Sequence, residues 1–283
     1  SLGVLVVVNG GLFIGGGVCV VLVLWLGRRD VAAWDEIFFA VSMAVGLLLM
    51  RRLVAVRTPA EAGALIGTAI IIFVYRAKPL SGPGASWFEI DVLGFDPQFF
   101  SVLSLIASLL TLVGMIVLRP MMANHTIACI VIFLTCSEAL LSLPNLALYY
   151  GVHEWTSAMT GGVVDARFIA LVDTAVESPL GQVSMIPMLA WIARNAPSGL
   201  KATFFAVMVS FTNLALSASS LGTKYPNQIF VVTREVTDAD GTVVTAADYT
   251  QPGPLLITVA VLTLVAPLIA IVIIQNSRFR SED

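Results

Sequence analysis

Residues 254–275 read PLLITVAVLTLVAPLIAIVIIQ, a continuous apolar run without a charged side chain. The length of this run matches the roughly 17–25 residues that an α-helix needs to cross the hydrocarbon core of a bilayer. An amphipathic helix of a soluble protein would carry polar residues along one face, and this run has no such face. The stretch therefore predicts a membrane-spanning helix close to the end of the chain.

Similar apolar runs recur along the rest of the sequence. In lipid every backbone polar group must be satisfied within the segment, so each run is expected to be a helix. The alternating pattern of outer-membrane barrel strands is absent. The fold class predicted is therefore an all-α polytopic membrane protein with about eight transmembrane helices. The expected spans lie at about 2–26, 35–53, 60–76, 98–118, 125–148, 167–193, 200–222 and 254–275.

The composition agrees with a membrane protein and argues against several other classes. Of the 283 residues, 58% are apolar and 12% are charged, whereas about a quarter of the residues in a soluble domain are charged. The net charge is −3 and no basic stripe indicates nucleic-acid binding. Cys19, Cys129 and Cys136 form no CxxC or Cys/His cluster. We therefore expect the lipid bilayer as a partner, with no nucleic acid, metal or cofactor; the oligomeric state stays open.

The loops predict an orientation. Basic residues divide almost evenly between the two sides, so they decide little. The long polar loops at 77–97, 149–166 and 223–253 all fall on one side, together with most of the acidic residues. We therefore expect that side to be extracytoplasmic and the C-terminus to be cytoplasmic, in a bacterial inner (plasma) membrane.

The loop at 223–253 has turn and strand signals of its own. Residues 229–236 are rich in β-branched side chains, and Asp240-Gly241 is a hairpin turn signal before Thr242–Thr245. The pattern predicts a short extracytoplasmic β-hairpin, and a disordered loop is the alternative.

Three acids stand inside predicted spans, where a charged group is costly and indicates function by default. Asp173 and Glu177 lie four residues apart, so both project from one face of a helix. Glu138 lies in the middle of the span at 125–148. The functional interpretation is a polar path in which a carboxylate binds a proton or a solute group. The alternative is that the acids pair with Arg76, Arg167 or backbone groups and only fix the packing of helices.

Other polar side chains could contribute to the same site. Gln182 lies close to the face of Asp173 and Glu177, and Asn213 stands in the span at 200–222. Small polar residues also join membrane helices without any further role. No paired catalytic aspartates, Ser/His dyad or HExxH motif is present, so we expect no enzyme.

A family pattern becomes visible around these acids. The segment VDTAVESPLGQVSMIPM at 172–188 is followed by NAPSGLKATFFA at 195–206 and by VSFTNLA at 209–215. Together they resemble the folate-biopterin transporter (FBT) family of the major facilitator superfamily. FVYRAKP at 73–79 and LGFDPQF at 93–99 resemble the segments around the family's seventh and eighth spans. The resemblance extends over about residues 62–276 and is weak over 1–54.

The resemblance implies a division of the chain. A complete family member has twelve spans in two halves. Residues 1–54 would then be the last two helices of the N-terminal half, and 55–61 would be the cytoplasmic linker. Residues 62–283 would form the C-terminal six-helix bundle of a major-facilitator-like fold, with the extracytoplasmic hairpin loop at 223–253. On this interpretation four N-terminal helices precede the chain.

The resemblance also implies a function: a secondary active transporter of folate- or pterin-like small molecules that works by alternating access, with proton symport as one mode. Asp173 and Glu177 would exchange a proton or hydrogen-bond the pterin ring, Asn213 and Gln182 would offer amide contacts, and Arg76 would attract the glutamate carboxylate of a folate. Three alternatives stay open: a bundle that carries another organic solute, an inactive scaffold, and an intramembrane prenyltransferase-type enzyme. The last needs a second acidic cluster, which Glu138 alone does not supply.

Overall fold

The computed structural model describes residues 25, 33–55, 58–180, 186, 189–192 and 201–280. This part of the chain is helical except for one small hairpin, which confirms the all-α polytopic class. The expected span 2–26 lies outside the described residues apart from Trp25. The elements are α2 Trp34–Val54, α3 Pro59–Arg76, α4 Pro83–Asp91, α5 Pro97–Val117, α6 Arg119–Asn124, α7 Ile127–Tyr149, α8 Val152–Met159, α9 Ala166–Glu177, the 3-10 helix η1 Ser178–Leu180, α11 Lys201–Ile229, β1 Val236–Thr237, β2 Val243–Thr245 and α12 Pro252–Gln275.

Five helices of the described part are long and apolar enough to cross a membrane: α3, α5, α7, α11 and α12. Their bounds agree closely with the expected spans, although α11 continues to Ile229 rather than ending near 222. The expected span 35–53 forms the 21-residue helix α2.

The expected span 167–193 is described only in part, and its helix changes character at Ser178. The α-helix α9 ends at Glu177 after 12 residues, and η1 follows at Ser178–Leu180. Pro179 explains the change, because proline lacks the N–H that the α-helical ladder needs and its ring clashes with the preceding turn.

Helix starts follow from the local sequence. Thr58 and Glu61 form a capping box at the start of α3, in which each side chain accepts a hydrogen bond from the other's backbone N–H. Asp96, Thr126 and Asp165 cap α5, α7 and α9 in the same manner, each accepting from the backbone N–H three residues later. These caps place the helix starts where the apolar runs begin.

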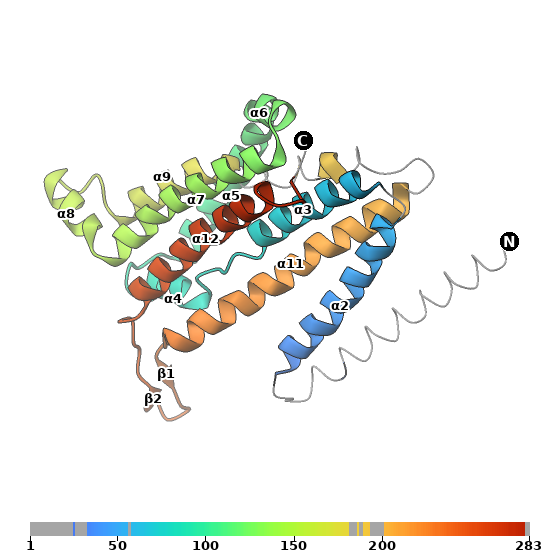
Figure 1. Cartoon of the computed structure of the whole chain (residues 1–283). Coiled ribbons are helices and arrows are strands. Elements are labelled where there is room, and N and C mark those ends of the chain that lie inside the picture. Colours follow the sequence, from blue (N-terminus) through green and yellow to red (C-terminus); the bar gives the residue numbers. More distant parts are fainter. Residues whose placement is uncertain are drawn as a thin grey trace.

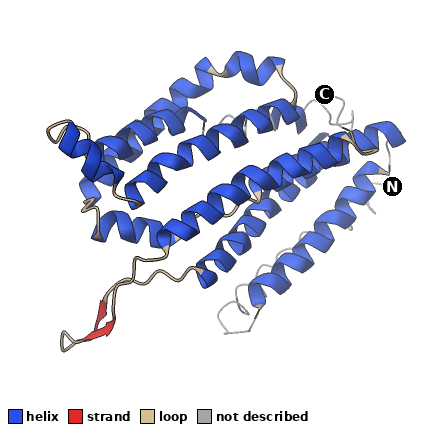
Figure 2. Ribbon diagram, turned by 60° about the vertical axis from the view of Figure 1, so that its left-hand side comes forward, coloured by secondary structure: helices blue, strands red, loops and turns tan. Residues whose placement is uncertain are grey.

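The helices lie side by side in a slanted bundle (Figures 1 and 2). The helix α12 packs against α7 and α3, α11 packs against α2 and α3, and α5 packs against η1 and α9. In Figure 1, α4, α8 and the hairpin lie toward one end of the bundle, while α6 and the C-terminus lie toward the other. The three long polar loops therefore share one end, as the loop pattern predicts.

The expected β-hairpin is confirmed, with shorter strands than the sequence suggests. Val236 pairs with Thr245 and Thr237 with Val243, and Gly241 turns the chain with a φ of 79°. The strand region starts later than expected because α11 continues through Ile229. The short helices α4 and α8 occupy loops that the hydropathy pattern assigns no structure.

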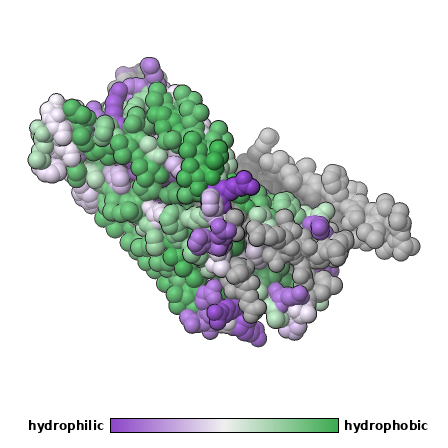
Figure 3. Space-filling view, turned by 90° about the horizontal axis from the view of Figure 1, so that it is seen from above, coloured by the Kyte–Doolittle hydropathy of each residue, from purple (hydrophilic) through white to green (hydrophobic). Residues whose placement is uncertain are grey.

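The outer surface of the bundle is apolar. On α5, Leu105 is 61% exposed, Leu112 56% and Ile116 75%. Figure 3 shows hydrophobic residues over a broad area of the described part, with hydrophilic residues in smaller patches. An apolar surface of this extent on helices of membrane-spanning length is expected to face lipid or other apolar helices.

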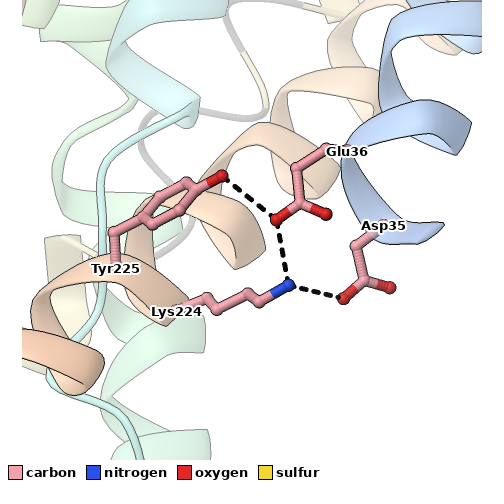
Figure 4. Close-up of polar contacts among 4 residues, drawn as sticks. All are labelled: Asp35, Glu36, Lys224 and Tyr225. Atoms are coloured by element: carbon pink, nitrogen blue, oxygen red, sulfur yellow. Dashed lines mark hydrogen bonds and ion pairs between the residues drawn. The ribbon is translucent and has the colours of Figure 1, made fainter. Parts of the chain in front are cut away.

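One ionic cluster joins α2 to α11 at the end that carries the hairpin (Figure 4). The Lys224 ammonium lies 2.9 Å from Glu36 Oε1 and 3.3 Å from Asp35 Oδ2. The hydroxyl of Tyr225 donates a hydrogen bond of 3.1 Å to the same oxygen of Glu36. The first turn of α2 is thereby fixed to the last turns of α11.

Candidate functional site

Glu138, one of the acids selected from the sequence, is held between two elements. Its Oε1 accepts a 2.7 Å hydrogen bond from the Tyr75 hydroxyl, and its Oε2 pairs with the Lys78 ammonium. The side chains of Lys78 and Glu138 are only 17% and 25% exposed. Lys78 Nζ also lies 4.1 Å from the centroid of the Tyr75 ring, within cation–π range. We call Tyr75, Lys78 and Glu138 the Lys78 cluster.

The position of Lys78 follows from the way α3 ends. The helix stops at Arg76, and the segment after it is tied to α11 by side-chain hydrogen bonds. The Ser219 hydroxyl donates to the Lys78 carbonyl, and Thr223 Oγ1 accepts from the Leu80 N–H at 2.9 Å. These bonds hold the Lys78 side chain at the end of α3, within reach of α7.

Asp173 is the most buried of the selected acids, with 6% of its surface exposed. Its Oδ2 accepts a 3.1 Å hydrogen bond from Asn145 Nδ2 on α7. Its Oδ1 is buried and has no hydrogen-bond partner among the described residues. A buried polar atom without a partner costs free energy, so a donor that reached Oδ1 from a ligand or from water would be favoured there.

Glu177 differs from Asp173 although both lie on α9. It is the last residue of the helix and is exposed, whereas Asp173 is buried. Its carboxylate is within electrostatic range of Glu138 and Lys78, and it also acts on Asp173. The three selected acids on α7 and α9 therefore lie close enough for their charges to interact, and the Lys78 ammonium lies beside Glu138.

The remaining selected residues lie in other settings. Asn213 is exposed on α11. Arg76 is the half-buried last residue of α3, next to Tyr75, and Gln182 lies outside the described residues. Arg167, considered as a partner for the acids, instead pairs with Asp96 at 2.8 Å. The alternative that names Arg167 as a partner of the three acids is therefore wrong.

Sequence reasoning missed Tyr75, Lys78 and Asn145. Tyr75 and Lys78 stand three apart at the end of an apolar run, where an aromatic ring and a lysine usually serve as interfacial anchors. Asn145 directly follows Pro144 within α7. No signal in the sequence marks them, because their contacts with Glu138 and Asp173 form only once the helices pack together.

The arrangement can bind a polar solute with groups of both signs. An ammonium with an aromatic ring next to it can hold a carboxylate or a planar group. The Asp173 oxygen that has no partner in the described part of the chain and the exposed Glu177 carboxylate can accept from N–H donors or exchange protons.

Comparison with known proteins gives a match along most of the chain. The profile of the BT1 family matches residues 30–282. The match begins well before residue 62, where the resemblance in the sequence begins, and it includes α2. No solved structure matches the chain.

Two curated relatives are similar to part of the chain. A "Folate-biopterin transporter" of Synechocystis sp. is 29% identical over 146 residues, which cover 52% of this chain and 28% of the relative. A "Folate transporter 2" of Plasmodium falciparum is 24% identical over 149 residues, covering 53% of this chain and 31% of the relative. The matched part thus spans less than a third of each relative's length.

Proposed function

The chain belongs to the BT1 family, and from this premise we propose that it forms part of a secondary active transporter of folate- or pterin-like small molecules. The names of these two relatives support this substrate class. Transporters built from repeated helical halves bind their cargo near the bilayer midplane, between those halves.

The observation that carries the proposal is the combination of Asp173 with the Lys78 cluster. Asp173 has a buried oxygen without a hydrogen-bond partner among the described residues, and the shielded Lys78–Glu138 pair lies among helices that otherwise present apolar surface. Such groups inside a membrane bundle typically mark a substrate or proton path. In this proposal Asp173 and Glu177 exchange a proton or bind the heterocycle.

Other residues have supporting roles in the proposal. Lys78 attracts a carboxylate of the solute in competition with Glu138, and Arg76, the last residue of α3, adds positive charge. Asn213 on α11 offers an amide contact, and Gln182 is proposed as a second amide ligand. The coupling ion is a proton and the mode is symport.

The proposal includes a topology. Residues 1–54 belong to the first half of a major-facilitator-like bundle, 55–61 form the linker, and 62–283 form the second half. The end that carries α4, α8 and the hairpin is extracytoplasmic, and the C-terminus is cytoplasmic in a bacterial plasma membrane. The sharing of one end by the three polar loops supports this arrangement.

Uptake of labelled folate and biopterin tests the proposal, in cells that express this chain together with any sequence that precedes it in its gene. Asp173→Asn is expected to reduce uptake at least about tenfold, as loss of an essential interaction does, while the amount of protein in the membrane stays the same. Glu154→Gln on α8 removes an exposed acid and is the matched control. Uptake that does not exceed empty-vector cells for either compound would contradict the proposed substrate class.

A further inference from the structure

A cavity of about 90 Å3 lies between the surface helix α4 and the membrane helices α7 and α12. This volume is enough for several water molecules. Most of the lining is apolar, and Glu89 is its one charged side chain. The lining residues are Ser81, Ala85, Phe88, Glu89, Leu93, Asn145, Leu148, Pro252 and Leu256.

Asn145 connects this cavity to Asp173. Asn145 lines the cavity, and its side chain donates the 3.1 Å hydrogen bond to Asp173 Oδ2. Only 6% of the surface of Asp173 is exposed, and its Oδ1 has no hydrogen-bond partner in the described part of the chain. The negative charge of Glu89, another residue that lines the cavity, also acts electrostatically on Asp173. Asn145 therefore links the cavity to Asp173, the most buried acid of the candidate site.

The helix α4, which carries Glu89, is held in place by side chains of the 223–253 loop. The Arg234 guanidinium donates to both oxygens of Asp91, at 2.8 and 2.7 Å, and the Tyr249 hydroxyl donates to Asp91 as well. Val232 lies directly over Gly84, where an added Cβ would meet it at 2.9 Å. The arms of the hairpin loop therefore hold α4 against the bundle, which keeps the cavity open at a defined place.

We propose that this cavity is the extracytoplasmic water route to Asp173, and that Glu89 is the acid that exchanges protons along it. The inference rests on the proposed function for its orientation and for the role of Asp173. The groups that face Asp173 are Asn145 from α7, Glu89 from α4 and Glu177 from its own helix; Glu138 and Lys78 act on Glu177. Burial also raises the pKa of Glu89, which favours proton uptake nearer neutral pH.

Accessibility of a cysteine tests the route without any transport. The native cysteines are replaced by serine, and Asn145→Cys is exposed to silver ions outside intact cells; thiols that survive are then labelled in denaturant. We expect silver to protect Asn145→Cys from later labelling. Ser86→Cys, exposed on α4, is the positive control, and Leu105→Cys, on the apolar surface of α5, should stay unprotected.

Two results of this experiment would overturn the route. The first is an Asn145→Cys thiol that stays fully labelled while Ser86→Cys is protected. The second is protection of Asn145→Cys only when silver reaches the other face, in inside-out vesicles. Because labelling needs no solute, an absence of folate uptake refutes the proposed substrate while leaving this test intact.

The pH profile of uptake tests Glu89 itself. Glu89→Gln removes both the acid of the proposed route and its negative charge beside Asp173, so the pH at which uptake falls to half should move to lower pH. Glu89→Asp should keep the wild-type profile, and Glu154→Gln should leave it unchanged. A Glu89→Gln profile identical to wild type would remove Glu89 from the route.

Discussion

At the scale of single residues, the Lys78 cluster shows why an acid inside a membrane bundle needs its neighbours before a role can be assigned. Glu138 is neither free nor paired with the arginines that the sequence offered; it accepts from Tyr75 and pairs with Lys78. A shielded ion pair of this kind contributes little net stability when intact but is costly when broken, because one charge is left without its partner.

This asymmetry gives a prediction for the stability of the bundle. Glu138→Leu leaves the 17%-exposed Lys78 side chain without its carboxylate, and we expect a loss of about 1–3 kcal/mol, below the value for a fully buried pair. Thermal unfolding of the purified protein in detergent would show this as a lower midpoint. The double variant Glu138→Leu/Lys78→Met should recover part of the loss, since the two residues are coupled. A double variant as unstable as the sum of both singles would contradict the coupling.

The acids of the site could be found from sequence, but their partners could not. A carboxylate in an apolar run stands out by its cost alone, which selects Asp173, Glu177 and Glu138. Nothing in the pattern around Lys78 or Asn145 marks them, because a lysine at a helix end and an asparagine within a helix are ordinary in membrane proteins. Their roles depend on contacts across 60 and 28 residues of chain.

At the scale of elements, α5 and η1 make a close contact that depends on one glycine. An added Cβ at Gly114 would lie 2.3 Å from the Pro179 carbonyl oxygen, and Thr111 Oγ1 donates to the Ser178 carbonyl at 2.9 Å. Because a backbone atom cannot yield as a side chain can, the two elements meet only where no side chain intervenes.

Gly114→Val should therefore separate α5 from η1. We expect a loss of about 1–3 kcal/mol, as for other over-packed positions, together with a reduced amount of folded protein in the membrane. Fluorescence-detected size exclusion after heating measures both effects. Ser104→Val adds the same side chain on the exposed surface of α5 and should leave stability unchanged. Equal stability of the two variants would show that the contact is not required.

The clamp between α4 and the hairpin loop has a predictable pH range. Hydrogen bonds from Arg234 and Tyr249 hold the pKa of Asp91 below its ordinary value of 3.8, so its contribution is present above that value and is lost only as pH falls through the lower folded pKa. Burial and the bond to Asp91 raise the pKa of Tyr249 to about 12 from 10.0, so that donor is lost only as pH rises toward 12. The clamp should stay closed throughout the physiological range.

Trypsin can report the state of this clamp, because it cleaves after Arg234 once that side chain is released. Wild-type protein should resist cleavage there equally from pH 6 to pH 9. Asp91→Asn should speed cleavage several-fold at neutral pH, whereas Asp240→Asn at the exposed turn should have no effect. Rapid wild-type cleavage within this pH range would mean that the clamp is open in solution.

Elements differ in how far the sequence predicts them. Long apolar runs predict α5, α7 and α12 almost to their ends, since the bilayer fixes both length and composition. The helices α4 and α8 are missed because they are short and of mixed polarity. The change from α9 to η1 at Ser178 is not predicted, because Pro179 weighs little in a hydropathy window although it changes the backbone.

At the scale of the whole molecule, the pairing of α2 with α11 is the arrangement that the sequence could not predict. More than a hundred residues separate them, and both carry ordinary charged ends. The Lys224 ammonium nonetheless lies 2.9 Å from Glu36 and 3.3 Å from Asp35. Under the proposed topology α2 belongs to the first half and α11 to the second, so this cluster bridges two bodies that must move apart at the extracytoplasmic side during each cycle.

Locking the bridge tests that division of the chain. Asp35→Cys with Lys224→Cys, in a background without native cysteines and with any upstream sequence present, should be joined by a bifunctional methanethiosulfonate reagent whose spacer replaces the length of the lost ion pair. If the halves rock against each other, the cross-link should abolish folate uptake and reduction should restore it. Asp96→Cys with Arg167→Cys, which replaces an ion pair within the second half at 2.8 Å, is the matched control and should retain uptake after treatment with the same reagent. Full uptake with α2 locked to α11 would mean that these helices move as one body, and the boundary between the halves would then have to lie before α2.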